Sequence, residues 1–250
     1  MKNNFISKVK AYCKKVFQSK NYTCVYCDRE VFQGECFCQS CLKKLPFNDG
    51  QSCEICGRQV AEGVEICKEC LQDRPLYTLA KSNFVYDENI GKLLYRFKNG
   101  DRYLVDAFAP FADFFFASGI FNVDCIVYVP MFFSDERRRG YNQAGVLATA
   151  LGMRYNIPIV HDKIIKIKQT KMQKTLNKVN RMQNLKESVI LVDKDYFLGK
   201  KVLIVDDVLT TGATSDTVAK CLKDGGCTAV YLYTIASVAL QENVSAVAEI

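Results

Sequence analysis

The sequence predicts an α/β protein with a parallel, doubly wound sheet and helices on both faces, preceded by a small cysteine-rich domain. In the carboxyl-terminal half, short β-rich runs alternate with helical stretches, which is the pattern of a parallel sheet. The first part of the chain instead carries four C-x2-C pairs, which are typical of a metal module. Because the composition changes near residue 76, we predict one domain at 1–76 and a second at 77–250.

The elements of the second domain follow from apolar runs and turn signals. We expect strands at 124–130, 157–160, 188–192, 201–207 and 229–238 and a helix at 139–155. Thr214 or Ser215 is expected to cap a further helix that ends at Gly225 and Gly226. Ligands of such sheets bind beyond the carboxyl ends of the strands, and Asp206 and Asp207 fall at such an end.

Hydropathy and charge limit where the chain can act. The most apolar segment, 105–121, contains Asp106, Pro110 and Asp113, so we predict a buried amphipathic helix and no membrane span. The first 17 residues have a helical period with lysines between, but lack the apolar core of a signal peptide. We therefore expect that this amino-terminal helix packs on its own domain and that the protein is cytoplasmic.

The net charge of +7 is unevenly spread, because residues 160–190 alone hold eight Lys and Arg residues. Such a segment suits a polyanion, either a phosphorylated small molecule or a nucleic acid. A solvated lysine-rich loop would have the same composition, so charge alone leaves both interpretations open.

The cysteine pairs form an internal repeat. The spacing C-x2-C-x10-C-x2-C occurs twice, and the second copy follows the first by 29 residues at all four positions. Two such pairs direct four thiolates at one tetrahedral Zn²⁺, which predicts a closed, structural site in each repeat. Interleaved pairing between the repeats, redox pairs and an iron–sulfur cluster are the alternatives. The predicted ligands are Cys24, Cys27, Cys38, Cys41, Cys53, Cys56, Cys67 and Cys70.

The stretch VLIVDDVLTTGAT combines two acids with a turn of small residues. Backbone N–H groups ahead of a helix suit an anion, so the turn predicts a phosphate cradle made by Thr210, Thr211, Gly212, Ala213 and Thr214. Adjacent carboxylates repel phosphate but accept hydrogen bonds from vicinal hydroxyls. Asp206 and Asp207 therefore indicate a ribose that carries a 5-phosphate. The alternatives are a phospho-acceptor acid pair and a plain strand end followed by a capped helix.

These motifs resemble a known family. IVDDVLTTGAT is similar to the phosphoribosyl-pyrophosphate (PRPP) signature of type I phosphoribosyltransferases. VPMFFSDERRRGYNQA, TKMQKTLNKVNRMQN and YDENIGKLLYRFKNGD resemble three segments of the competence protein F (ComF) family, which also carries an amino-terminal zinc module. The resemblance covers the chain from Cys24 to about residue 240.

The resemblance implies a type I phosphoribosyltransferase-like fold and a set of residue roles. Asp206 and Asp207 would hold the ribose 2- and 3-hydroxyls as the catalytic pair, with Mg²⁺ bridging ribose and pyrophosphate, and 210–214 would cradle the 5-phosphate. The pyrophosphate loop and the active-site loop would contribute Pro130, Met131, Arg139, Lys171 and Gln173.

The implied function is PRPP binding in natural competence, the uptake of external DNA, with phosphoribosyltransferase activity if the site is active. No motif names an acceptor. The alternative is a zinc-dependent protein that binds single-stranded DNA or a competence helicase-like partner and keeps a regulatory or vestigial PRPP site.

Overall fold

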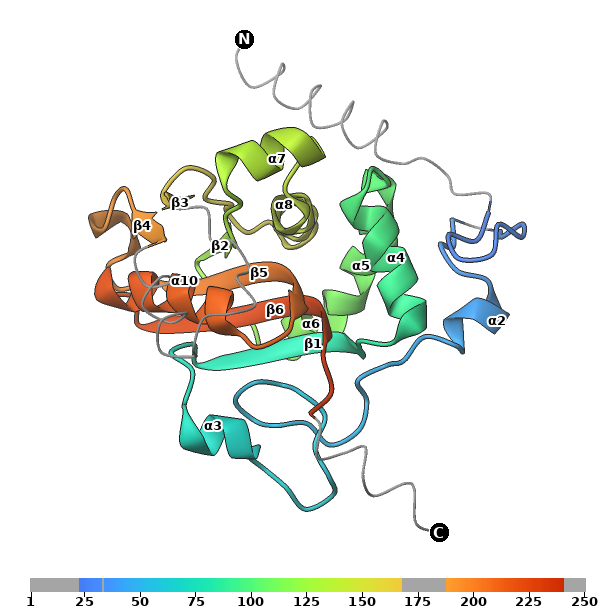
Figure 1. Ribbon diagram of the computed structural model, residues 1–250, viewed down its shortest axis with the longest axis horizontal. Coiled ribbons are helices and arrows are strands. Elements are labelled where there is room, and N and C mark those ends of the chain that lie inside the picture. The colour runs from blue at the N-terminus through green and yellow to red at the C-terminus, as the bar shows by residue number, and fades with distance from the viewer. Residues whose placement is uncertain (1–22, 33, 168–187, 241–250) are drawn as a thin grey trace, which may run out of the picture. The chain divides into compact units, whose positions relative to one another are not determined.

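The computed structural model describes residues 23–32, 34–167 and 188–240. The chain forms two compact units, Met1–Leu45 and Pro46–Ile250 (Figure 1). The described part of the first unit contains α2 (Gln39–Leu42) and a bridge between Thr23 and Glu30. Its small core consists of Cys24, Val31 and Cys41.

The second unit is built on a four-stranded sheet in the order β1-β6-β5-β2. The strands are β1 (Leu79–Val85), β2 (Cys125–Tyr128), β5 (Lys201–Leu209) and β6 (Ala229–Ser237). Every neighbouring pair is parallel, as the sequence predicts. All carboxyl ends therefore lie at one edge of the sheet, and Tyr128 of β2 pairs there with Val205 of β5.

Helices cover both faces of this sheet (Figure 1). α10 (Ala213–Asp224) contacts β5 and β6, and its Val218 shares a core cluster with Ile204 of β5. α8 (Gln143–Tyr155) contacts β2 and β5, and its buried Leu147 and Leu151 lie outside that cluster. Because side chains alternate across a strand, α8 and α10 pack against opposite faces of β5.

α4 (Glu88–Lys98) leads to the carboxyl edge of the sheet. Asp87 caps it by accepting a 2.9 Å hydrogen bond from the Ile90 N–H. Its buried side chains recur at helical spacing and fix one face on the core: Ile90, Leu93, Leu94 and Phe97. This packing determines where the last residue, Lys98, lies.

The segment 105–121 is not one helix, as the sequence suggests, but three short pieces. They are α5 (Val105–Phe108), η2 (Ala109–Ala112) and α6 (Asp113–Ala117), and they follow the turn η1 (Arg102–Leu104). Pro110 lacks an N–H and lies in η2, where the helical hydrogen bonds change from α to 3-10 geometry. The predicted burial holds in α5 and fails in α6, which has no buried residue.

The predicted helix at 139–155 is also divided. α7 (Phe133–Arg139) ends at Gly140, which has a φ of +84°. α8 then begins after Asn142, whose side chain accepts a hydrogen bond from the Gly145 N–H. Separate stop and start signals thus lie within a segment that reads as one helix.

Two predicted strands do not become full strands of the parallel sheet. Segment 188–192 becomes β4 (Val189–Leu191), which pairs antiparallel with β3 (Ile164–Lys166) in a separate two-stranded sheet. Segment 157–160 contributes a single parallel bridge between Ile159 and Ile126. Short apolar runs predict a strand but not its partner, because pairing depends on the tertiary structure. The turn η3 (Asp195–Phe197) connects β4 to β5.

The second cysteine module, which includes α3 (Lys68–Gln72), belongs to the same compact unit as the sheet. Its cysteines share a hydrophobic cluster with Val230 and Leu232 of β6. The contacts thus divide the chain after Leu45, whereas the composition changes near residue 76.

The predicted amino-terminal helix lies outside the described residues. Among the described helices, none has the length and apolar character needed to cross a bilayer.

Candidate functional site

Each cysteine repeat forms its own tetrad. Within each set of four, all Sγ atoms lie within 4.8 Å of one another. The Sγ–Sγ distance is 3.7 Å for both Cys27–Cys38 and Cys56–Cys67. A tetrahedral zinc with metal–sulfur bonds of about 2.3 Å has edges of about 3.8 Å. The residues therefore fit one structural Zn²⁺ per repeat, and the interleaved pairing is wrong.

The electrostatics of the second tetrad also suit a cation. Burial raises the pKa of the Cys56 thiol to about 12, with the charges of Cys53 and Cys67 adding to the shift, while the Arg58 backbone N–H opposes it. Four thiolates cannot share so small a buried volume without a compensating positive charge. A divalent ion supplies that charge and holds the thiols deprotonated.

The second tetrad is fixed to the sheet by a close backbone approach. The Ala80 N–H donates a 2.7 Å hydrogen bond to the Ile55 carbonyl, and the Asn48 amide donates one of 2.7 Å to the Gly57 carbonyl. Gly57 has a φ of +67°, and a Cβ there would lie 2.4 Å from the Ala80 oxygen. Only glycine fits this position, so the close packing of the second cysteine module on β1 depends on Gly57.

The two carboxylates lie side by side near the carboxyl end of β5. The Asp207 N–H donates to Asp206 Oδ1 at 2.8 Å, and Ser215 Oγ lies 3.4 Å from Asp206 Oδ2. Lys98 Nζ, at the end of α4, forms an ion pair with Asp207 Oδ2 at 2.9 Å. Helix α4 therefore supplies a positive charge to an acid pair that is more than 100 residues further along the chain.

The acids differ in their surroundings. Burial, and next the charge of Asp207, raises the pKa of Asp206 to about 7. Two adjacent carboxylates resist carrying two full charges, so one proton is retained near neutral pH. A site that holds one proton close to its working pH can accept hydrogen bonds from hydroxyls once that proton leaves.

The turn after β5 presents unpaired donors. Gly212, with a φ of +79°, is the N-cap of α10 and supplies no side-chain cap. The helix therefore begins ahead of the predicted caps Thr214 and Ser215, because glycine reaches the left-handed conformation that the turn needs. The backbone N–H groups of Thr211, Gly212 and Thr214 find no acceptor among the residues that the structure describes. Together with the helix N-terminus, they can bind an anion.

The loop after β2 lies at the same edge of the sheet. The Val129 N–H donates to the Val205 carbonyl at 3.0 Å, which places Pro130 and Met131 beside the end of β5. The Asn142 amide donates to the Val129 carbonyl at 3.0 Å and so fixes the start of this loop.

Arg139 is linked to the acid pair through two intermediate residues, Gln143 and Lys98. Its Nη1 donates to Gln143 Oε1 at 2.7 Å, and Gln143 Nε2 lies 3.4 Å from the Lys98 carbonyl. Gln143 is 2% exposed, so it acts as a buried connector. The structure thus brings Pro130, Met131 and Arg139 to the carboxyl edge, whereas Lys171 and Gln173 lie outside the described residues.

The predicted site residues do not include four residues near this edge: Arg58, Lys98, Gln143 and Lys166. Lys98 and Gln143 lie inside motifs that carry the family resemblance, which was the available signal. The pKa of Lys166 is lowered by burial, while the charges of Asp135 and Asp206 oppose the shift. Nothing in the sequence separates Arg58 from Arg29, the equivalent residue of the first repeat.

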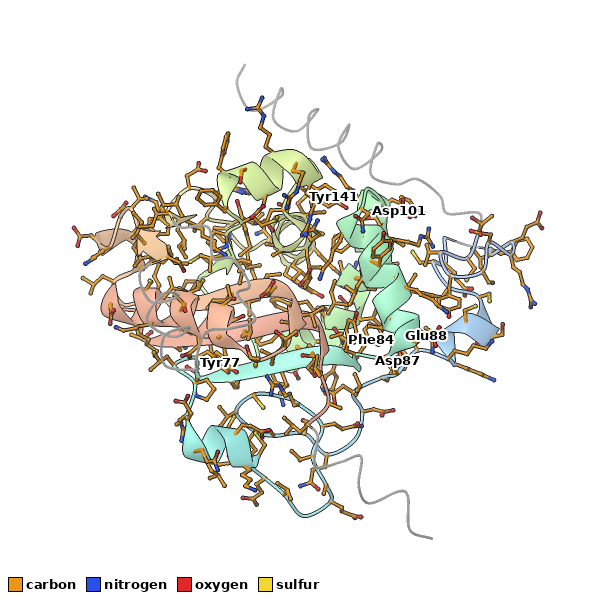
Figure 2. The ribbon with its side chains drawn as sticks, in the orientation of Figure 1. Tyr77, Phe84, Asp87, Glu88, Asp101 and Tyr141 are labelled. Carbon is orange, nitrogen blue, oxygen red and sulfur yellow. The ribbon has the colours of Figure 1, made fainter. Side chains whose placement is uncertain are left out.

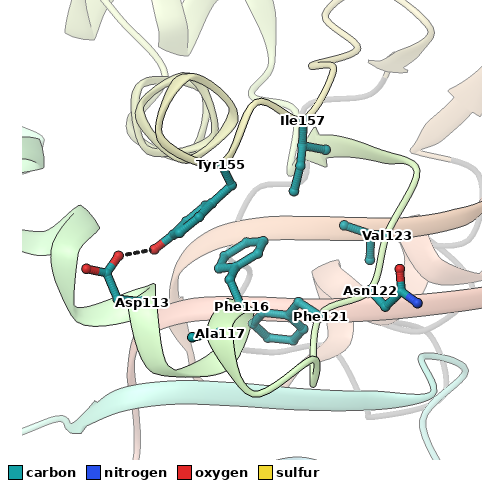
Figure 3. Close-up of a pocket in the computed structure, with 8 residues that line it drawn as sticks. All are labelled: Asp113, Phe116, Ala117, Phe121, Asn122, Val123, Tyr155 and Ile157. Atoms are coloured by element: carbon teal, nitrogen blue, oxygen red, sulfur yellow. Dashed lines mark hydrogen bonds between the residues drawn. The ribbon is translucent and has the colours of Figure 1, made fainter.

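A separate hollow of about 600 Å³ lies elsewhere (Figure 3). Its lining includes Phe121 and Val123, which precede β2, and Tyr155 at the end of α8. Asp113 accepts hydrogen bonds from Tyr155 and Arg154 there. The hollow is at the amino end of β2, opposite the edge where ligands of parallel sheets bind.

Comparison with known proteins agrees with this arrangement. Residues 20–71 match the double zinc ribbon domain, and residues 136–245 match the phosphoribosyl transferase domain. The chain is therefore a protein with a double zinc ribbon and a phosphoribosyltransferase-like α/β domain.

The chain also has homologues among competence proteins. It is 35% identical over 114 residues to competence protein F of Haemophilus influenzae, covering 45% of this chain and 50% of that protein. It is 32% identical over 158 residues to competence protein ComFC of Bacillus subtilis, covering 62% of each chain. It is 31% identical over 112 residues to the DNA utilization protein YhgH of Escherichia coli, covering 45% of this chain and 48% of that protein. The matches thus span about half to three-fifths of these relatives.

Proposed function

We propose that this chain binds PRPP together with Mg²⁺ at the carboxyl edge of its parallel sheet. The observation that carries the proposal is the placement of an acid pair directly before a turn of unpaired N–H groups. The acids suit the vicinal hydroxyls of a ribose, and the turn suits its 5-phosphate.

The proposed roles follow the geometry. Asp206 and Asp207 accept hydrogen bonds from the ribose 2- and 3-hydroxyls, and residues 210–214 hold the 5-phosphate. The pyrophosphate lies toward Pro130, Met131 and Arg139, and Lys171 and Gln173 are further residues proposed to bind it. A Mg²⁺ ion bound with PRPP would be held near Asp206 and Asp207 and would supply positive charge for the departing pyrophosphate.

The arrangement suits phosphoribosyl transfer to an acceptor. That reaction passes through a positively charged ribose, and its catalysis is mainly positioning and charge stabilisation. The acid pair lies where such a ribose would bind, and Lys98 offsets part of its charge in the free protein.

The test is a calorimetric titration of PRPP and Mg²⁺ into the zinc-loaded protein. We expect micromolar binding by the wild type and no measurable binding by the Asp206→Asn, Asp207→Asn double variant. Asp224→Asn is the matched control, because Asp224 ends α10 in an exposed pair with Lys220. Equal affinity in the wild type and the double variant would contradict the proposal.

We further propose that the protein acts on DNA during natural competence. The support is the set of homologues named for competence and for DNA utilization. We place it in the cytoplasm, where cysteine thiols stay reduced and available to zinc.

The DNA proposal is tested by fluorescence anisotropy of a labelled single strand with the full chain. Binding should weaken steeply between low and physiological salt. If the first ribbon carries the contact, the Arg29→Gln, Lys43→Gln, Lys44→Gln variant should bind several-fold less tightly. No binding at low salt would contradict direct binding of DNA by this chain. The protein would then act on DNA through a partner protein.

A further inference from the structure

Arg58 of the second zinc ribbon reaches the proposed phosphate loop. Its Nη2 donates a hydrogen bond to the Thr210 carbonyl oxygen, which lies 152 positions later in the sequence. Both residues belong to the same compact unit. The ribbon and the loop are therefore joined by a direct side-chain contact.

Hydrogen bonds within the second ribbon fix the backbone position of Arg58. The Cys53 N–H donates a 2.8 Å hydrogen bond to the Arg58 carbonyl, which closes the turn between the first two cysteines of the tetrad and Arg58. The preceding residue is Gly57, whose close approach to Ala80 holds the turn against β1. The same turn thus presents two metal ligands, Cys53 and Cys56, and the guanidinium.

The contact sets the orientation of one peptide group in the loop. The carbonyl of Thr210 and the N–H of Thr211 belong to the same planar trans peptide and point in opposite directions. A guanidinium that holds the carbonyl on the ribbon side therefore directs the Thr211 N–H to the other side. That N–H has no acceptor in the described part of the chain, as a donor reserved for an anion requires.

The residues that directly follow the ribbon, Leu76 and Tyr77, also lie close to this turn. The Leu76 N–H donates to Asp216 Oδ1 in the first turn of α10. The hydroxyl of buried Tyr77, labelled in Figure 2, lies 3.7 Å from the place of a Cβ on Gly212. Hydrogen bonds from the ribbon side thus reach the loop at Thr210 and the first turn of α10 at Asp216.

The Arg58 side chain also carries an unpaired donor. Its Nε is buried and has no hydrogen-bond partner among the described residues. A buried donor without an acceptor is unfavourable, so stability of the ribbon alone does not account for this placement. Each such unpaired group in a native protein calls for an explanation, and a functional role is one of those known.

We propose that Arg58 is a positioning residue of the phosphate loop: it fixes the Thr210–Thr211 peptide so that the loop binds the phosphate of PRPP. This rests on the proposed function and adds that the second ribbon, through Arg58, is part of the binding machinery.

The two repeats provide a matched pair of variants. Arg29 occupies the place of Arg58 in the first repeat, and the Cys24 N–H donates to its carbonyl at 2.7 Å in the same way. Arg58→Gln and Arg29→Gln therefore make the same chemical change at equivalent turns. Arg58→Lys keeps the charge but loses the planar group of donors.

The experiment measures three properties of each zinc-loaded full-length variant: zinc content, hydrogen exchange of the 209–216 amides, and PRPP affinity. We expect two zinc ions in every variant. Arg58→Gln should exchange faster in 209–216 and bind PRPP about tenfold more weakly, as for the loss of one hydrogen bond to a charged group. Arg58→Lys should fall between, and Arg29→Gln should match the wild type.

Unchanged exchange in 209–216 for Arg58→Gln would overturn the inference, as would unchanged PRPP affinity. A wild type that binds no PRPP would contradict the proposed function and, with it, the affinity effect. In that case, hydrogen exchange at 209–216, measured without ligand, would still test whether Arg58 orders the loop. Equal exchange in Arg58→Gln and Arg29→Gln would contradict that part of the inference as well.

Discussion

At the residue scale, the two adjacent acids lie in different electrostatic environments. Asp207 has a cationic partner in Lys98, whereas desolvation, and next the charge of Asp207, raises the pKa of Asp206 to about 7. A neighbouring pair of identical groups thus divides into one member paired with a cation and one that holds a proton near neutral pH. This division determines how ligand binding should respond to pH.

We expect PRPP binding to release protons below pH 7 and to release few above it. Accepting hydrogen bonds from ribose hydroxyls requires ionised Asp206, so the proton that its raised pKa retains must leave when the ligand binds. Affinity should fall by up to about tenfold per pH unit below pH 7. Calorimetry at pH 6.3 and pH 8.0, in two buffers of different ionisation enthalpy, counts the protons. Equal counts at the two pH values would refute the assignment to Asp206.

We expect Lys98 to contribute more to PRPP binding than to the stability of the fold. Lys98→Met leaves two adjacent carboxylates without their cation, which should raise the pKa of the pair and weaken PRPP binding about tenfold at pH 7. Lys92→Met on the same helix is the control, because Lys92 pairs with Glu88 at an exposed site. The affinities of the two variants are compared by titration, and equal values would mean that Lys98 does not tune the acids.

At the element scale, the second ribbon is held against β1 by contacts that a side chain would disrupt. Gly57 and Gly63 both have a positive φ, but only Gly57 lies against another strand, whereas nothing lies within 4 Å of a Cβ on Gly63. The two glycines therefore separate the cost of backbone conformation from the cost of lost contact with the sheet.

Gly57→Ala should lower the free energy of unfolding by about 3 kcal/mol, because its Cβ would overlap the Ala80 carbonyl as well as strain the backbone. Gly63→Ala should cost about 1 kcal/mol, the conformational part alone. Urea denaturation of the zinc-loaded proteins measures both. A similar loss in the two variants would show that the close approach to β1 contributes nothing.

At the scale of the whole molecule, the two zinc ribbons are not equivalent. The second tetrad shares the hydrophobic cluster of the sheet, whereas the first has its own small core in a separate compact unit. The metal in the second ribbon should therefore stabilise the unit that carries the phosphate loop.

Cys56→Ser should lower the melting temperature of the sheet by several degrees and speed hydrogen exchange at 209–216. Cys27→Ser should remove one zinc and leave both properties close to the wild type. Metal content by mass spectrometry, thermal melts and hydrogen exchange on the two variants make the comparison. A sheet that melts equally early in both variants would contradict the separation of the two units.

The sequence by itself determined the features that depend on local spacing. The eight zinc ligands, the strand that carries Asp206 and Asp207, the glycine-containing turn after it and the parallel sheet were all predicted, because cysteine spacing and strand–helix alternation are local patterns. Where local signals conflicted, prediction failed: segment 105–121 is interrupted at Pro110, and 139–155 contains both a helix end and a helix start.

Only the tertiary structure decided which distant residues meet. The Lys98–Asp207 pair and the Arg58–Thr210 contact join segments more than 100 residues apart. Pairing of β3 with β4, rather than with the main sheet, was decided in the same way. A local pattern gives each segment its form, whereas a contact between segments depends on how whole elements pack, and packing is a property of the complete core.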